Sequence, residues 1–92
     1  MKQYTLKLYV TGNSLHSQRA VANLHQLCTD MLPNKYELSV VDVLADPDQA
    51  EQDRILATPT LIRVRPEPAR RVIGDLSDTQ RVMLALDLQP TK

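Results

Sequence analysis

The sequence predicts a small α/β domain with the element order β-α-β-α-β-β-α. Three observations support this: apolar residues alternate near the N-terminus, an apolar stripe of helical spacing follows, and Val/Leu-rich segments are separated by helix-capping residues. At 92 residues the chain has the size of one domain. Because so small a domain buries a limited share of its surface, we expect a marginally stable native state that association or a second conformation can shift.

The first expected strand covers residues 5–10, where Leu6, Leu8 and Val10 share one face. Residues 11–14 (Thr-Gly-Asn-Ser) have the chemistry of a turn and a helix cap. A helix is expected from about residue 14 to residue 31, before Leu-Pro-Asn ends it. Its apolar stripe consists of Ala20, Val21, Leu24, Leu27, Cys28 and Met31.

A second strand is expected over residues 36–44, which are rich in Val and Leu. A helix of this length between two strands favours a right-handed βαβ unit with parallel strands. Asp46 followed by Pro47 then indicates a helix start, and Gln49 completes a capping box. The sequence therefore predicts a short helix that ends at about Leu56.

The remaining elements are two strands and a final helix. Residues 60–64 and 71–73 have strand composition and flank a turn at 65–68, where two prolines exclude helix. Ser77 and Gln80 form a second expected capping box. It opens a helix whose apolar residues are Val82, Met83, Leu86 and Leu88.

Charge and composition restrict the function. Eleven basic and eleven acidic residues cancel, so we expect no nucleic-acid binding. The charges are nevertheless separated, since residues 42–53 carry only acidic charges and residues 54–71 carry five arginines and one acid. This asymmetry favours docking on a partner of complementary charge, with a simply solvated surface as the alternative.

The compartment expected from the sequence is the cytoplasm. Cys28 is the single cysteine, so an internal disulfide is excluded. The N-terminal residues run directly into a strand pattern without an apolar signal region. No apolar run approaches the roughly 20 residues needed to cross a bilayer, so we expect no membrane partner.

With Thr58-Pro59-Thr60 before the third strand, the element order is similar to the thioredoxin fold, which predicts a cis peptide bond before Pro59. A thioredoxin places its Cys-x-x-Cys motif after the first strand, but residues 11–17 contain no cysteine. Dithiol redox chemistry is therefore excluded. Cys28 lies about three helical turns later on the apolar stripe, and we interpret it as a small buried apolar residue.

Other catalytic or ligand-binding patterns are missing as well. Ser14, His16 and Ser17 are neighbours in a capping segment, and no third group is seen to orient a base. His16 and His25 lack metal-ligand spacing. Two glycines, at positions 12 and 74, are too few for a phosphate-binding loop. We expect no enzymatic activity, cofactor or metal.

Four segments make the sequence resemble the KaiB family. They are residues 6–13 (LKLYVTGN), 41–44 (VDVL), 53–61 (DRILATPTL) and 70–77 (RRVIGDLS), in the order and spacing of that family. The resemblance covers nearly the whole chain. It implies a single domain, residues 1–92, with a thioredoxin-like fold and an alternative KaiB ground-state fold.

The resemblance also implies a function. KaiB proteins are non-enzymatic regulators of a circadian clock or a related stress system, and they bind a KaiC-type ATPase ring. Further implied partners are KaiA, a SasA- or CikA-type histidine kinase, and copies of the same chain in a resting dimer or tetramer. Residues 1–46 would stay constant while residues 47–92 change fold, as bistable proteins do when two packings differ by only a few kcal/mol.

Particular residues are implicated through the same resemblance. The partner-binding residues implied are Arg19, Arg54, Ala57, Arg70 and Arg71. The residues implied in fold switching and proline isomerisation are Tyr4, Pro59, Pro66, Pro68, Ala85 and Asp87. Between positions 59 and 68 there are three prolines, for which an ordinary sharply bent loop is the alternative interpretation.

Two departures from the family pattern affect these expectations. The sequence stops at Lys92 without the acidic tail of clock KaiB proteins, and Ala85 stands where those proteins have glycine. Alanine favours a helix over glycine by up to about 1 kcal/mol, so we expect this chain to favour the thioredoxin-like state. Ala22 and Asn23 also leave the first helix with few basic residues, which predicts a changed partner affinity.

Two other functional classes remain as alternatives. One is a stand-alone thioredoxin-like sensory module of the SasA type that acts in signal transduction. The other is a degenerate thioredoxin or glutathione-linked oxidoreductase, which the absence of a cysteine near Gly12 opposes.

Overall fold

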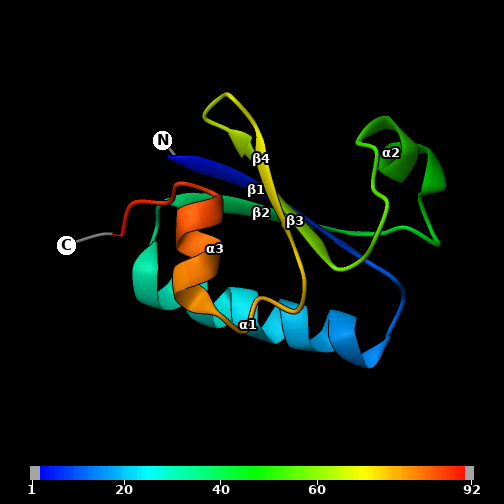
Figure 1. Cartoon of the computed structure of the whole chain (residues 1–92), viewed down its shortest axis with the longest axis horizontal. Helices are drawn as coiled ribbons and strands as arrows, with labels where there is room; N and C mark the ends of the chain where they lie inside the picture. The colour runs from blue at the N-terminus through cyan, green and yellow to red at the C-terminus, as the bar shows by residue number, and fades with distance from the viewer. Residues whose placement is uncertain (1–2, 91–92) are drawn as a thin grey trace.

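A computed structural model describes residues 3–90; residues 1–2 and 91–92 of the predicted domain lie outside the described part. The described chain forms one four-stranded sheet and three helices, in the predicted order (Figure 1). The elements are β1 (Tyr4–Val10), α1 (Leu15–Met31), β2 (Tyr36–Asp42), α2 (Pro47–Gln52), β3 (Thr60–Arg65), β4 (Arg70–Ile73) and α3 (Thr79–Ala85).

The sheet has the strand order β2-β1-β3-β4. β1 pairs parallel with β2, as predicted for two strands joined through a helix, and antiparallel with β3. β4 pairs antiparallel with β3 and forms one edge of the sheet. β1 is therefore a central strand, and its seven residues are buried or half-buried.

Helices pack on both faces of this sheet. α1 and α3 lie on one face and enclose the main core, whereas α2 lies apart from them on the other face (Figure 1). Each fully buried leucine of the main core contributes roughly 1.5–3 kcal/mol to folding. The fully buried residues of this core are Leu6, Leu8, Ala20, Leu24, Cys28, Leu32, Leu61 and Leu86. The smaller cluster under α2 consists of Tyr9, Ala50 and Ile62, with Val41, Val43, Ile55 and Val64 packed around it.

Two helix starts follow the predicted capping chemistry. The Ser14 hydroxyl accepts a hydrogen bond from the Ser17 amide at 3.2 Å. The Asp46 carboxylate accepts one from the Gln49 amide, also at 3.2 Å, and Pro47 occupies the first turn of α2. The Gln49 side chain returns to the Asp46 carboxylate at 2.9 Å, not to the Asp46 backbone amide as in a capping box.

Three boundaries predicted from the sequence are wrong. β2 ends at Asp42 and not at residue 44, because the chain turns there toward α2. α2 ends at Gln52 and not near Leu56, because Arg54 adopts a left-handed backbone with φ of 55°. α3 begins at Thr79 with Asp78 as its cap, since the Asp78 carboxylate accepts from the Arg81 amide at 3.1 Å. Ser77 instead donates its amide to the Asp75 carboxylate at 3.1 Å.

Two predictions about single residues are confirmed. The Thr58–Pro59 peptide bond is cis, as are the bonds before Pro66 and Pro68. Cys28 is fully buried, and desolvation raises the pKa of its thiol to about 11. Its thiol is therefore uncharged at neutral pH, as expected for a structural cysteine.

Candidate partner-binding site

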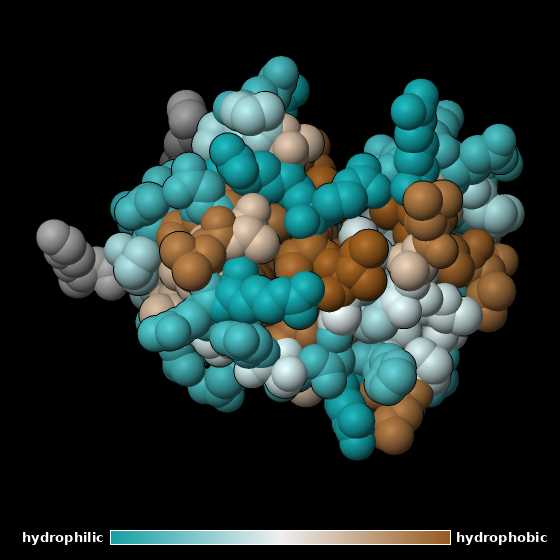
Figure 2. Space-filling model, in the orientation of Figure 1, coloured by the Kyte–Doolittle hydropathy of each residue, from teal (hydrophilic) through white to brown (hydrophobic). Residues whose placement is uncertain are grey.

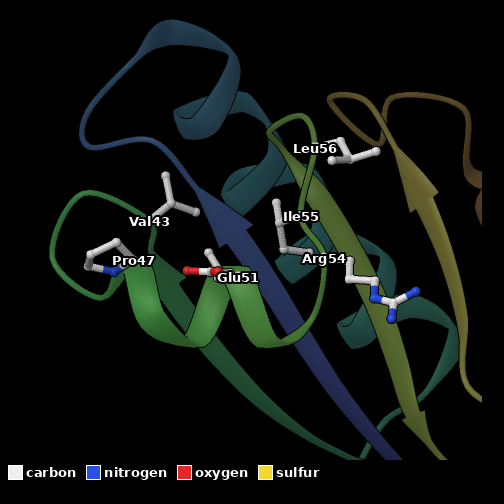
Figure 3. A pocket seen from close by; sticks show the side chains of 7 residues that line it. Val43, Pro47, Glu51, Arg54, Ile55 and Leu56 are labelled. Atoms are coloured by element: carbon white, nitrogen blue, oxygen red, sulfur yellow. The ribbon is translucent and has the colours of Figure 1, made fainter.

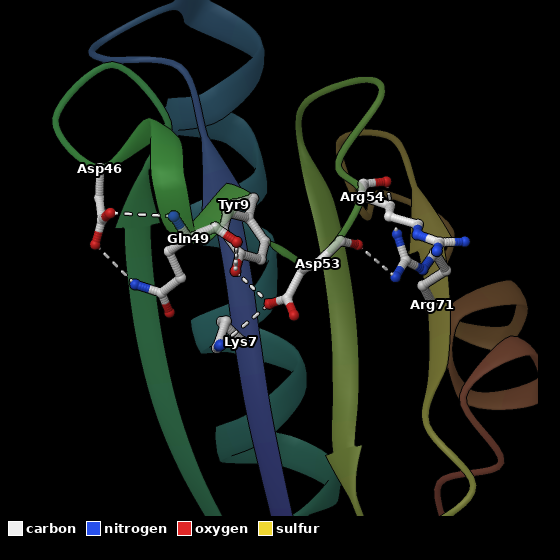
Figure 4. Close-up of polar contacts among 7 residues, drawn as sticks. All are labelled: Lys7, Tyr9, Asp46, Gln49, Asp53, Arg54 and Arg71. Carbon is white, nitrogen blue, oxygen red and sulfur yellow. Dashed lines mark hydrogen bonds and ion pairs between the residues drawn. The ribbon is translucent and has the colours of Figure 1, made fainter. Parts of the chain in front are cut away.

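A polar cluster joins the end of α2 to the central strand. The Asp53 carboxylate, directly after α2, lies 3.2 Å from the Lys7 ammonium and accepts a hydrogen bond from the Tyr9 hydroxyl (Figure 4). The same hydroxyl lies 3.3 Å from the Gln49 carbonyl oxygen. Lys7 and Tyr9 are two residues apart on β1, so both side chains lie on the face covered by α2.

The contacts in this cluster shift the pKa values of the Asp53 carboxyl and the Tyr9 hydroxyl. The hydrogen bond from Tyr9 is the main cause that holds the pKa of the Asp53 carboxyl below its usual range. Burial opposes it, and the hydrogen bond and charge of Lys7 add to the lowering. Burial, followed by the Asp53 contact, raises the pKa of the Tyr9 hydroxyl well above its usual value. At neutral pH the pair is therefore a neutral phenol that donates to a carboxylate.

On the other side, Arg71 of β4 holds the backbone of the same segment. Its guanidinium donates to the Asp53 carbonyl oxygen at 2.8 Å and to the Arg54 carbonyl oxygen at 3.3 Å (Figure 4). These are carbonyls at the end of α2 that have no acceptor role within the helix. A cation at a helix C-terminus also complements the negative end of the helix dipole.

Exposed apolar side chains gather beside this cluster. The Leu56 side chain is 95% exposed and Leu44 is 70% exposed, although large aliphatic residues are usually buried. Figure 2 shows apolar surface at the right of the view, over α2 and the loops beside it. An open groove of about 550 Å³ runs here (Figure 3). Its lining residues are Val43, Pro47, Ala50, Glu51, Arg54, Ile55 and Leu56.

The predicted partner-binding residues do not form one surface. Arg54 and Ala57 are exposed in the segment between α2 and β3, and Arg71 contacts that segment. Arg70 is exposed on β4, and strand alternation directs it to the face covered by α1 and α3. Arg19 is exposed on α1, where its charge helps to lower the pKa of the Asp75 carboxyl after the hydrogen bonds from Ser77.

The residues expected to act in fold switching also lie in separate places. Tyr4 is buried on β1, and its hydroxyl accepts the Gln89 amide at 2.8 Å. Ala85 is the last residue of α3, and Asp87 follows it with a left-handed φ of 50°. Ala85 and Asp87 therefore lie at the end of α3, and Tyr4 is joined through Gln89 to the segment that follows it. Pro59 precedes β3, whereas Pro66 and Pro68 lie in the turn between β3 and β4.

Sequence reasoning did not identify Lys7, Tyr9 and Asp53 as a cluster. A signal was present, because Tyr9 shares the polar face of β1 with Lys7, and a buried tyrosine hydroxyl requires a hydrogen-bond partner. The sequence could not predict that the chain after α2 returns across the face of the sheet that carries Lys7 and Tyr9.

Residues 3–90 contain no group of three or more metal-ligating side chains, and none of their helices is long and apolar enough to cross a membrane.

Comparison with known sequences identifies one family. Residues 7–88 match the KaiB domain. The chain is 46% identical over 90 residues to the circadian clock protein KaiB3 of Synechocystis sp. The aligned region covers 98% of this chain and 88% of that protein. It is 52% identical over 87 residues to the circadian clock oscillator protein KaiB of Prochlorococcus marinus, covering 95% of this chain and 76% of the relative.

Solved structures confirm the thioredoxin-like fold. The N-terminal domain of SasA from Synechococcus elongatus superposes with a TM-score of 0.76 at 23% identity, covering 100% of this chain and 90% of that domain. Mitochondrial thioredoxin 3 from Saccharomyces cerevisiae gives a TM-score of 0.75 at 14% identity, over 95% of this chain and 79% of the thioredoxin. At these identities the likeness establishes the fold alone.

Proposed function

The chain belongs to the KaiB family, and from this premise we propose that it is a non-enzymatic cytoplasmic regulator that binds a KaiC-type ATPase ring and modulates its phosphorylation or ATPase cycle. The observation that best supports this is the pairing of an exposed cation, Arg54, with the 95% exposed Leu56. Arginine is enriched among the interface residues that contribute most to binding, and exposed apolar surface beside it is a common mark of an interaction site.

The proposed contact has two parts. Arg54 would pair with a carboxylate of the ring, and Leu56 and the neighbouring groove would receive aliphatic side chains. Ala57 follows in the same exposed segment. Arg19 and Arg70 lie on other surfaces, so they contribute only if the ring reaches around the molecule. We propose KaiA and a SasA- or CikA-type kinase as further partners.

Gel filtration with a KaiC-type hexamer tests this proposal. The wild-type chain is expected to co-elute with the hexamer, and Arg54→Glu is expected to abolish co-elution by reversing the charge. Arg65→Glu is the matched control, because Arg65 is exposed at the end of β3, outside the proposed site. No co-elution of the folded wild-type chain, or equal loss with both variants, would contradict the proposal.

We also propose that residues 47–92 can adopt a second packing in a resting dimer or tetramer, while residues 1–46 keep theirs. The place of Ala85 and Asp87 at the end of α3, next to the Gln89 amide that the Tyr4 hydroxyl accepts, supports this, because changes there would alter how the last helix docks. A concentration series of amide NMR spectra tests it. Changes confined to residues 47–92 on association are expected, and changes spread evenly over both halves would contradict it.

A SasA-type sensory module is a second candidate, favoured by the likeness to the SasA domain over the whole chain. Such a module would bind the ring without refolding. A single set of amide signals at all concentrations, together with ring binding, would favour this candidate.

A further inference from the structure

The segment that follows α2 is held by side chains of two strands, β1 and β4, on one face of the sheet. Lys7 of β1, Ile62 of β3 and Arg71 of β4 are register partners, so they form one row across the face under α2. The residues 53–57 segment passes over this row. Its Asp53 carboxylate is bound at β1 by Lys7 and Tyr9, and its Asp53 and Arg54 carbonyls are bound at β4 by Arg71.

These contacts hold a conformation that the chain would not adopt readily by itself. Arg54 has φ of 55°, a left-handed region that non-glycine residues occupy at an energetic cost. The Arg54 amide donates to the Glu51 carbonyl at 3.0 Å, and the Ile55 amide to the Ala50 carbonyl at 2.9 Å. Ile55 then packs under α2, which leaves Leu56 directed outward.

Arg71 is therefore engaged within the molecule. Its two hydrogen bonds go to main-chain carbonyls of the segment, so a partner carboxylate would have to compete with them. Arg54 donates no hydrogen bond from its guanidinium to another described residue, and its side chain is exposed. The two arginines thus differ in role although they are close together.

We propose that Asp53 and Arg71 are positioning residues: they clamp the residues 53–57 segment between β1 and β4 and thereby present Arg54 and Leu56 to the partner. This inference rests on the proposed function, because it assigns the two residues a role in that same binding site. It departs from the expectation that Arg71 itself contacts the partner. Bidentate geometry, and not charge alone, is what Arg71 would supply.

Hydrogen exchange of the free protein tests the clamp without any partner. Arg71→Lys keeps the charge but cannot bind two carbonyls with one planar group, and Tyr9→Phe removes the hydroxyl while keeping the buried ring. Both variants are expected to speed exchange of the Arg54 and Ile55 amides by roughly tenfold or more, with β1–β2 amides unchanged. Unchanged exchange in both variants would overturn the proposal.

Binding to the KaiC-type hexamer tests the positioning. Arg71→Lys is expected to weaken binding by roughly tenfold, whereas Arg65→Lys, at the exposed end of β3, should leave binding unchanged. In an Arg54→Asn background the Arg71→Lys change should have little further effect, because both act through the same residue. Full affinity of Arg71→Lys would overturn the positioning role.

These two measurements separate the inference from the proposed function. If the wild-type chain does not bind the hexamer, the proposed function fails, and the exchange rates still decide whether the clamp exists. If the wild-type chain binds and exchange is unchanged in the variants, the inference alone fails.

Discussion

At the scale of single residues, two charged side chains of this protein have unusual surroundings. Asp53 is a carboxylate whose charge is stabilised by a phenol and an ammonium. Arg63 is the reverse case, a guanidinium that is only 4% exposed and has no carboxylate within 4.0 Å among residues 3–90. It donates to the Pro68 carbonyl at 2.7 Å and to the Asp87 carbonyl at 3.5 Å, and its Nε finds no partner among the described residues.

The Asp53 cluster predicts a pH dependence of stability. The Asp53 pKa is lower in the folded protein than in the unfolded chain, so its stabilising contribution is complete above the usual value near 3.8. That contribution is lost as the pH falls through the lowered pKa. In urea unfolding, wild type is expected to exceed Asp53→Asn in stability at about pH 6 and to converge with it toward about pH 2.

The groups that face Asp53 are Lys7 and Tyr9 on β1 and Arg71 on β4. A stability difference that persists unchanged at the lowest pH would show that the Asp53 charge is not what stabilises the cluster.

The Arg63 side chain joins the β3–β4 turn to the end of α3 through its two hydrogen bonds. Replacing it should lower the stability of the fold. Arg63→Met keeps an apolar stem of similar length but leaves the Pro68 and Asp87 carbonyls without their donor. We expect a loss of about 1–3 kcal/mol, or a drop in Tm of several degrees, in thermal unfolding.

Arg65→Met on the same strand is the matched control for Arg63. The Arg65 side chain is 69% exposed and pairs at 3.4 Å with Glu67, which is 78% exposed. Its replacement should change stability by less than about 0.5 kcal/mol. Equal effects of the two substitutions would mean that the buried contacts of Arg63 contribute nothing.

At the scale of elements, the sequence predicted those helices, strands and caps that depend on residues close together in the chain. β1 and α1 and the caps at Ser14 and Asp46 follow from alternation, helical spacing and side-chain acceptors within three residues. The chain just after α2 is bound by Arg71, which lies 17 residues after Arg54, and local sequence gives no sign of this contact. The start of α3 was misplaced because Ser77 and Asp78 are both good caps, and Asp75 already binds the Ser77 amide.

The same distinction applies to the candidate site. Arg54 and Ala57 were predicted as partner-binding residues because their segment resembles the KaiB family, and the structure leaves them exposed. Lys7, Tyr9 and Asp53 were missed because their contact joins positions 44–46 residues apart. The opposite directions of Arg70 and Arg71 follow from strand alternation, but only once β4 is assigned to begin at Arg70.

The end of α3 provides a prediction about fold preference. Ala85→Gly is expected to weaken α3 by up to about 1 kcal/mol, which is roughly a fivefold change in the population of a competing packing. Amide NMR should then show a second set of signals from residues 47–92, or a stronger one. Ala22→Gly in the exposed face of α1 is the control, because α1 belongs to the half proposed to remain constant.

Loss of stability without any second set of signals, equal in Ala85→Gly and Ala22→Gly, would show that Ala85 only stabilises its helix. The residue at position 85 would then have no effect on the balance between two folds.

At the scale of the whole molecule, the two faces of the sheet differ in how much of the apolar core they carry. The face under α1 and α3 contains most of the core, so its residues account for stability. The other face has a small apolar cluster, a polar clamp and an exposed segment held against it. A second exposed apolar region lies on α3, where Leu84 is 81% exposed.

The measurement that tests the account most directly is hydrogen exchange of this chain with and without a KaiC-type hexamer. We predict that binding slows exchange most strongly in residues 53–57 and in the groove beside α2, with α3 little changed. Protection centred on α3 and Leu84, with residues 53–57 unaffected by a hexamer that does bind, would contradict the proposed site.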